Sequence, residues 1–292
     1  MDIVNNRFRI IKSLKHTNLF HSYLVNDIWE DNKIMQLNIL HPDNTPKSII
    51  NYYSDEFIGL INFNSDIVVE VYNFNVISHI DNKRISREQY FYTCEYIENS
   101  SNLLELSKGM NLNEILNVFI ELCKIVNFIH LKGHVYEALN LNNLLVINND
   151  NNYQIKIKDI ATKELEKRSY LADNYEDPFF ASPKAISNRP ERIQDIYSLG
   201  VLLLSMLYAN KIDFRSTPKN EFMSFMTDLH NNNLQFSSHE VEIINKLSII
   251  INKLITYQED YPYKGIFHIL NDLNSNLNTE FKFNYQKDYS RI

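Results

Sequence analysis

Glycine is scarce in this chain. It accounts for 5 of 292 residues, whereas an average usage of roughly 7% would give about 20. The five are widely separated, at Gly59, Gly109, Gly133, Gly200 and Gly265. Neither a G-x-G-x-x-G loop nor a Walker A loop can be built from glycines spaced in this way. The sequence therefore excludes the nucleotide-binding loops that cradle phosphates with paired glycines.

Basic clusters, metal-binding cysteines and long apolar runs are also missing. The net charge is −7 and no run of Lys or Arg exceeds two residues, which disfavours a nucleic-acid partner. Cys94 and Cys123 lack metal-ligand spacing, so we expect reduced thiols and a cytoplasmic location. The polar start of the chain predicts no signal peptide, and the longest apolar run, Val201–Ala209, is too short to cross a membrane. We therefore expect no membrane partner.

The hydrophobic patterns divide the chain into a strand-rich front and a helical back. Strands are predicted at 8–12, 22–25, 33–40, 68–74 and 89–97, and helices at 47–60, 112–131, 195–208 and 238–256. Asp195 and Ser238 are the expected N-caps of the last two helices. This order predicts an α+β protein with two unequal lobes, 1–98 and 99–274, and a polar tail or linker at 275–292.

Five segments, in the same order along the chain, resemble motifs of protein kinases. Met35–Asp43 is similar to the third strand, V-A-L-K-V-L-H-P in bacterial members, and Tyr92–Ile97 resembles the hinge strand. Phe128–Val135 resembles the Y-L-H-x-x-G-I-V before the catalytic loop. Phe180–Lys184 resembles the end of the activation segment, and Asp195–Leu203 the start of the central helix. The resemblance implies a bilobal kinase-like fold, with a small antiparallel N-lobe containing one helix and a larger, mostly helical C-lobe.

The resemblance places uncharged residues at three positions where a kinase has charged catalytic groups. Asn38 stands where a lysine pairs with the α- and β-phosphates. Ala138 stands where an aspartate accepts the proton of the substrate hydroxyl, and Asn140 where a lysine neutralises the γ-phosphate. The phosphate-covering loop falls at 14–23, and each of its glycine positions carries a side chain. The resemblance thus implies a pseudokinase, a kinase-like domain that has lost phosphoryl transfer.

Two metal-binding positions of the family are retained. Asp159 matches the aspartate of D-F-G, and Asn143 matches the second metal ligand. Together with the phosphates of a nucleotide they could hold a divalent ion, and Glu95 and Ile97 of the hinge strand would then contact the nucleotide. Alternatively, the side chains of Asn143 and Asp159 form hydrogen bonds to the backbone only and hold no ion. We expect no cofactor, and ATP with magnesium is the alternative that the sequence leaves open.

Other matching residues are expected to serve the fold. Asp195 should still bond the backbone near Tyr136, and His130 should belong to the core or surface of its helix rather than to a metal site. Glu56 stands where the helix glutamate of a kinase would be, but its usual lysine partner is replaced by Asn38.

We therefore expect a catalytically inactive regulatory or scaffolding domain that acts through protein contacts. The resemblance is to bacterial serine/threonine kinase-like domains at the N-termini of larger signalling proteins. It implies a protein partner or a fused output domain, such as a diguanylate cyclase or a histidine kinase. Two alternatives remain: a non-hydrolysing nucleotide sensor that uses Asp159 and Asn143, and a weak atypical serine/threonine kinase.

Overall fold

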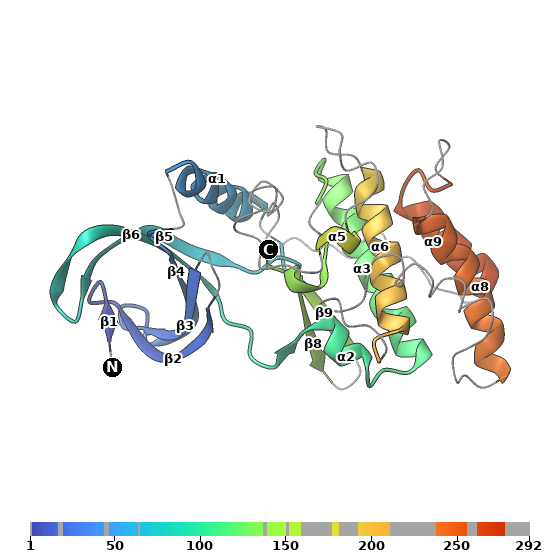
Figure 1. Ribbon diagram of the computed structural model, residues 1–292, viewed down its shortest axis with the longest axis horizontal. Coiled ribbons are helices and arrows are strands. Elements are labelled where there is room, and N and C mark those ends of the chain that lie inside the picture. Colours follow the sequence, from blue (N-terminus) through green and yellow to red (C-terminus); the bar gives the residue numbers. More distant parts are fainter. Residues whose placement is uncertain are drawn as a thin grey trace. The chain divides into compact units, whose positions relative to one another are not determined.

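The computed structural model divides into two compact units, the first holding the chain up to Glu98 and the second beginning at Asn99. Figure 1 shows the elements of both units. The structure describes residues 2–16, 20–43, 47–63, 65–136, 139–149, 152–158, 177–180, 192–210, 238–255 and 262–277. In these parts of the chain, no helix is both long and apolar enough to cross a membrane.

The described residues of the first unit form a closed antiparallel barrel with one helix. Its strands follow the order β1-β2-β3-β4-β6-β5 around the barrel. They are β1 (Ile3–Val4), β2 (Phe8–His16), β3 (Phe20–Asp27), β4 (Lys33–Leu40), β5 (Val71–Ile80) and β6 (Lys83–Glu95). Helix α1 (Lys47–Phe63) follows β4 in the chain and packs beside β5. The two-residue strand β1 closes the barrel through the pair Val4 and Ile80, which the sequence did not predict.

Alternating apolar residues fill the barrel. Met35, Leu37 and Ile39 of β4 all point into the core, because successive side chains of a strand face opposite sides of the sheet. The rings of Phe8 and Phe91 meet edge to face with centroids 5.5 Å apart. The side chains that alternate with them, Asn38 among them, lie on the other face of β4.

Asparagine and aspartate take the left-handed backbone positions in the turns of the barrel. The pairs Asn5-Asn6, Asp31-Asn32 and Asp81-Asn82 have φ angles from 47° to 61°. Asp81-Asn82 joins β5 to β6 as a two-residue turn with both φ angles positive, as a type I′ turn requires. Asn and Asp tolerate this region because their short polar side chains can bond locally. The scarcity of glycine therefore does not prevent tight hairpins.

The second unit is mostly helical, with a small antiparallel sheet of order β7-β8-β9. Its strands are β7 (Ser100–Ser101), β8 (Leu144–Asn149) and β9 (Asn152–Ile157). Its helices are α2 (Leu103–Ser107), α3 (Leu112–Leu131), the 3₁₀ turn η1 (Leu141–Asn143), α5 (Asp177–Phe180), α6 (Arg192–Leu207), α8 (Ser238–Ile255) and α9 (Ile266–Leu277). Figure 1 shows α6 beside α3.

Helix α6 is the centre of this unit. Its residues are buried from Gln194 to Leu207, as expected of a helix enclosed on all sides. A Cβ atom on Gly200 would lie 2.6 Å from side-chain atoms of both Leu254 and Ile255, so a glycine here allows α8 to pack closely. Gly133 ends the turn after α3 with a φ of 85°.

Several predicted boundaries were wrong. Helix α6 begins at Arg192, so Asp195 lies in its first turn and is not its N-cap, and Ser238 is already the first residue of α8. The predicted tail at 275–292 begins inside α9, because Ile269, Leu270 and Leu273 extend a buried apolar face and the helix continues to Leu277. In the barrel, β5 starts at residue 71 instead of 68, and β6 starts at 83 instead of 89.

Candidate functional site

Asn38 is the first candidate position, in the middle of β4. Its side chain is completely buried. It pairs with Ser22 of β3 on one side and with Tyr92 of β6 on the other. The residue therefore lies in the interior of the sheet, where each polar atom needs a hydrogen-bond partner from a neighbouring strand.

The amide of Asn38 finds those partners within the barrel. Its Oδ1 atom accepts hydrogen bonds from Ser22 Oγ at 2.6 Å and from Gln36 Nε2 at 2.8 Å. Its Nδ2 atom donates to Cys94 Sγ at 3.6 Å. Since an amide oxygen has two lone pairs, its accepting capacity is already filled. Asn38 is thus a neutral residue whose amide is bonded at both ends to β3, β4 and β6.

This network was not predicted from the sequence. Ser22 and Cys94 are nearly fully buried, and Cys94 is separated from Asn38 by 56 positions in the chain. The contact depends on the register that places β4 between β3 and β6. The only signal in the sequence is the alternation of Gln36 and Asn38 with the apolar residues of β4.

Glu95 and Ile97, the predicted nucleotide contacts of the hinge strand, lie at and just beyond the end of β6. The backbone N–H of Glu95 donates to the carbonyl of Glu70 at 2.7 Å, and Glu95 Oε2 accepts from the N–H of Glu70 at 3.2 Å. Burial and the carboxylates of Glu70 and Glu95 raise the pKa of Tyr72, so its hydroxyl stays protonated and donates to Glu70. The end of β6 is thereby tied to the segment before β5.

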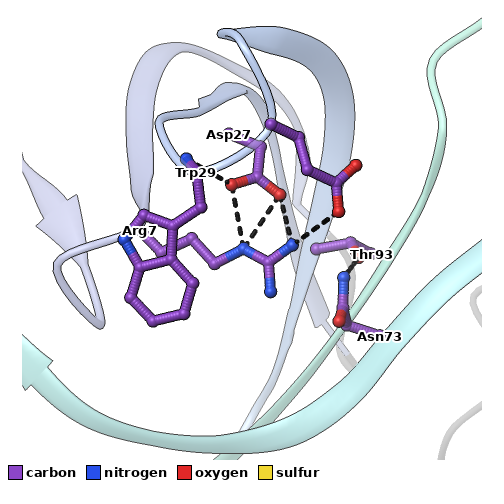
Figure 2. Close-up of polar contacts among 6 residues, drawn as sticks. Arg7, Asp27, Trp29, Asn73 and Thr93 are labelled. Carbon is purple, nitrogen blue, oxygen red and sulfur yellow. Dashed lines mark hydrogen bonds and ion pairs between the residues drawn. The ribbon is translucent and has the colours of Figure 1, made fainter.

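A second polar cluster of the barrel holds the turn between β3 and β4 (Figure 2). Asp27 is completely buried and accepts hydrogen bonds from Arg7 Nε at 2.8 Å and Arg7 Nη2 at 2.5 Å. The same guanidinium contacts Glu30 at 3.0 Å and lies over the ring of Trp29, 5.2 Å from its centroid. A bidentate arginine–carboxylate pair of this kind fixes geometry as well as charge. Arg7 thus contacts the side chains of Asp27, Trp29 and Glu30, and the cluster supports the turn.

Asn140 and Asn143, the candidates of the second unit, lie at the two ends of η1. Asn140 Oδ1 accepts from the backbone N–H of Asn143 at 3.1 Å, and both residues are buried. This is the bond of a helix-capping residue. The side chain that the resemblance places at a lysine position therefore stabilises a turn of the backbone.

Three predicted positions lie outside the described residues. They are Ala138, Asp159 and the side chain of Glu56. Asn143 is therefore the one predicted metal-binding residue that the structure places, directly before β8. The predicted pairing of Asn143 with Asp159 stays a prediction.

Asp195 joins three segments of the second unit. Its Oδ2 atom accepts hydrogen bonds from His130 Nε2 at 2.7 Å and from the backbone N–H of Tyr136 at 2.9 Å. All three residues are buried, and Arg192 adds a bond to the carbonyl of His130 at 3.0 Å. The predicted bond to the backbone at Tyr136 is confirmed, and His130 lies in the core, one of the two places expected for it. This buried carboxylate connects α3, α6 and the segment that precedes η1.

Comparison with known proteins gives a match over most of the chain. A sequence model of the protein kinase domain matches residues 9–261. NUAK family SNF1-like kinase 1 of Mus musculus is 33% identical over 104 residues, covering 35% of this chain and 15% of the relative. Serine/threonine-protein kinase 40 of Homo sapiens is 28% identical over 119 residues, covering 39% of this chain and 27% of the relative. The matched segments span less than a third of these relatives.

Proposed function

This chain belongs to the protein kinase family, and on that premise we propose that it is a pseudokinase. It holds the kinase-like fold, transfers no phosphate, and acts as a regulatory or scaffolding domain through contacts with another protein. The nucleotide pocket of an active kinase neutralises phosphate charge with a few positioned groups. In the proposed pseudokinase those charged groups are replaced, whereas the residues that stabilise the fold are retained.

The observation that carries the proposal is the bonding of Asn38. At a separation of about 4 Å, a unit charge near a protein surface contributes about 4 kcal/mol to the binding of an opposite charge. Asn38 has no charge, and its amide is bonded to Ser22, Gln36 and Cys94. A phosphate at this strand would gain no Coulomb energy from residue 38 and would have to break bonds that the sheet already makes.

Asn140 and Ala138 support the same conclusion in the second unit. The side-chain oxygen of Asn140 accepts a hydrogen bond from the backbone N–H of Asn143. Ala138 has a methyl group at the position that the resemblance assigns to the proton acceptor. With neither a lysine nor an aspartate at these positions, the loop offers no group to neutralise the γ-phosphate or to accept the substrate proton.

The wider role rests on the resemblance to bacterial signalling proteins. We assign the chain to the cytoplasm and to regulation through a protein partner or a fused output domain, with a diguanylate cyclase or a histidine kinase as examples. We assign the chain no nucleic-acid partner, no membrane partner and no bound nucleotide. The net charge of −7 and the absence of any longer basic run support the exclusion of nucleic acid.

A thermal-shift measurement tests the loss of nucleotide binding. At a ligand concentration of about 100 times Kd, binding stabilises a protein by about 2.7 kcal/mol, or several degrees for a chain of this size. With millimolar ATP and magnesium we expect no change in Tm. A rise in Tm that the Asp159→Ala variant abolishes would instead establish the nucleotide sensor.

Phosphate transfer is tested separately with labelled ATP and a generic protein substrate. We expect no incorporation above a reaction without the protein. Incorporation that is lost in Asp159→Ala would show a weak atypical kinase and would overturn the proposal. The same preparation should be used for both measurements, because a folded sample with a sharp melting transition makes the negative result informative.

A further inference from the structure

Strand β2 carries three exposed cations, at Arg9, Lys12 and Lys15. On a regular strand, side chains spaced by three residues would alternate between the two faces. The β2–β3 ladder has two register shifts, one just before Lys12 and one just before Lys15. Each shift adds one residue to β2 without using a residue of β3, as a β-bulge does. The two bulges therefore bring all three cations to the same face, where they form what we call the basic row.

The residues of β3 opposite the basic row show this face and carry no charge. Directly opposite residues of an antiparallel pair lie on one face of the sheet, as do alternate residues of a strand. The three opposite positions, in the order of the row, are Asn26, Leu24 and Ser22. Since these alternate along β3, successive cations of the row are about 7 Å apart.

No carboxylate pairs with the basic row among the described residues. Arg7, directly before β2, differs in this respect, because its guanidinium binds Asp27 and Glu30. Asp2 meets β2 through its backbone, where its carbonyl accepts a hydrogen bond from the N–H of Ile10 at 3.0 Å. The positive charge of the row is thus available to a partner.

One edge of β2 is open along most of its length. On that side β1 pairs only with Phe8 and Arg9, and Asp2 bonds only Ile10. For residues 11–16, β3 is the one strand partner of β2 in the part of the chain that the structure describes. The N–H and C=O groups of an open edge can bond an added extended segment. Charged side chains at such an edge discourage pairing with most strands, so a segment that pairs here needs the opposite charge.

Apolar side chains accompany the basic row. Ile11, the extra residue of the first bulge, is 38% exposed, and Ile34 of β4 is 55% exposed. Ile34 lies opposite Asn26, which lies opposite Arg9, so it belongs to the same face as the row. Protein interfaces combine apolar and charged contacts, whereas the backbone of a nucleic acid offers mainly negative charge. These neighbours favour a polypeptide as the partner.

We propose that the basic row and the open edge of β2 bind an extended acidic segment of a partner protein. Alternate side chains of an extended segment are also about 7 Å apart, so acidic residues at every second position match the three cations. The net charge of −7 does not oppose this binding, because salt screens charges separated by more than about 8 Å. The proposal rests on the proposed function in one respect, which is that the chain acts through a protein partner.

The probe is a short labelled peptide that alternates Glu and Thr, and fluorescence anisotropy with the whole chain measures its Kd. Each exposed ion pair changes affinity by up to about fivefold, so we expect Lys12→Gln/Lys15→Gln to weaken binding about tenfold. The matched control Lys83→Gln/Arg84→Gln removes two exposed cations of β6 and should leave the Kd unchanged. Added salt should weaken binding to the unmodified chain more than binding to Lys12→Gln/Lys15→Gln.

Hydrogen exchange of the unmodified chain locates the peptide without any substitution. The peptide should protect the backbone amides of residues 10–16 and leave those of the β5–β6 hairpin unchanged. Protection elsewhere, no measurable binding, or equal Kd values for the two double variants would each overturn the proposal. Tighter binding of a single-stranded oligonucleotide or of anionic lipid vesicles than of the peptide would also overturn it, because the partner would then belong to another class.

Failure of this proposal is distinguishable from failure of the proposed function. If labelled ATP shows phosphate transfer while the peptide still binds β2, the pseudokinase assignment fails and the docking site on β2 stands. If the peptide does not bind and no phosphate is transferred, the docking site fails and the pseudokinase assignment stands.

Discussion

Asp195 of the second unit and Asn38 of the first unit are both completely buried polar residues, and they differ in charge. Asp195 is a carboxylate that accepts hydrogen bonds from His130 and from the backbone of Tyr136. Asn38 is an amide that is bonded to Ser22, Gln36 and Cys94. In both places the polar atoms are bonded within their own unit, but of these two residues only Asp195 is ionisable.

The difference indicates what a buried charge requires in order to persist in this fold. A charge in a protein interior is tolerated when it is paired and hydrogen-bonded. The carboxylate of Asp195 accepts hydrogen bonds from two donors of the protein itself, so it is satisfied without any ligand. A lysine in place of Asn38 would need an anion nearby, and in the proposed pseudokinase no nucleotide supplies one. An amide that bonds its neighbouring strands satisfies the same position without a ligand.

The largest effect is expected from Asp195→Ala. Removing one partner of a buried hydrogen-bonded pair costs about 3–5 kcal/mol, and here both His130 and the N–H of Tyr136 lose their acceptor. The measurement is the free energy of unfolding in urea. Asp195→Asn keeps one oxygen, which can accept from both donors because both bonds go to the same atom, Oδ2, and this variant should lose clearly less. A loss below about 0.5 kcal/mol in the alanine variant, typical of a surface site, would contradict the assigned role of Asp195.

An intermediate effect is expected from Asn38→Leu. The substitution keeps the bulk of the side chain but leaves the buried hydroxyl of Ser22 without its acceptor and removes one of the acceptors of Gln36, which costs about 1–3 kcal/mol. Asn75→Leu is the matched control, since Asn75 lies at an exposed position of β5. Urea unfolding should show a change within about 0.5 kcal/mol for the control. Equal values for the two variants would mean that the Asn38 network contributes nothing to stability.

The elements with a strong hydrophobic period were predicted well from the sequence. Strand β4 and helix α3 have the predicted bounds, at 33–40 and 112–131. The kinase-like α+β fold is confirmed by the family match, by the antiparallel barrel with one helix, and by the helices that follow it. The element bounds could be predicted because local periodicity determines them, whereas the kinase-like fold was implied by the resemblance of the five segments to kinase motifs.

The parts that were missed depend on register and on turns. Strand β6 begins six residues before its predicted start, because the Asp81-Asn82 turn pairs Lys83 with Ile80. The outer half of the strand is too polar to show an alternation of apolar and polar residues, so the sequence pattern gave no sign of it. Several of the turns depend on asparagines that adopt positive φ angles. The Asn38 network required the pairing of β4 with β6, which no local pattern encodes.

The smallest effect, and the closest test of the comparison, is expected from Asn140→Ala. Asn140 is an amide at a position that the resemblance gives to a lysine, and its oxygen caps the N–H of Asn143. Loss of a capping side chain typically costs about 1 kcal/mol, so urea unfolding should show a loss of that size and the Asn143 amide should exchange faster. Asn140→Asp retains the acceptor and should restore both values. If the alanine variant exchanges at the wild-type rate, the cap is absent, and Asn140 must then be explained by a role other than a structural one.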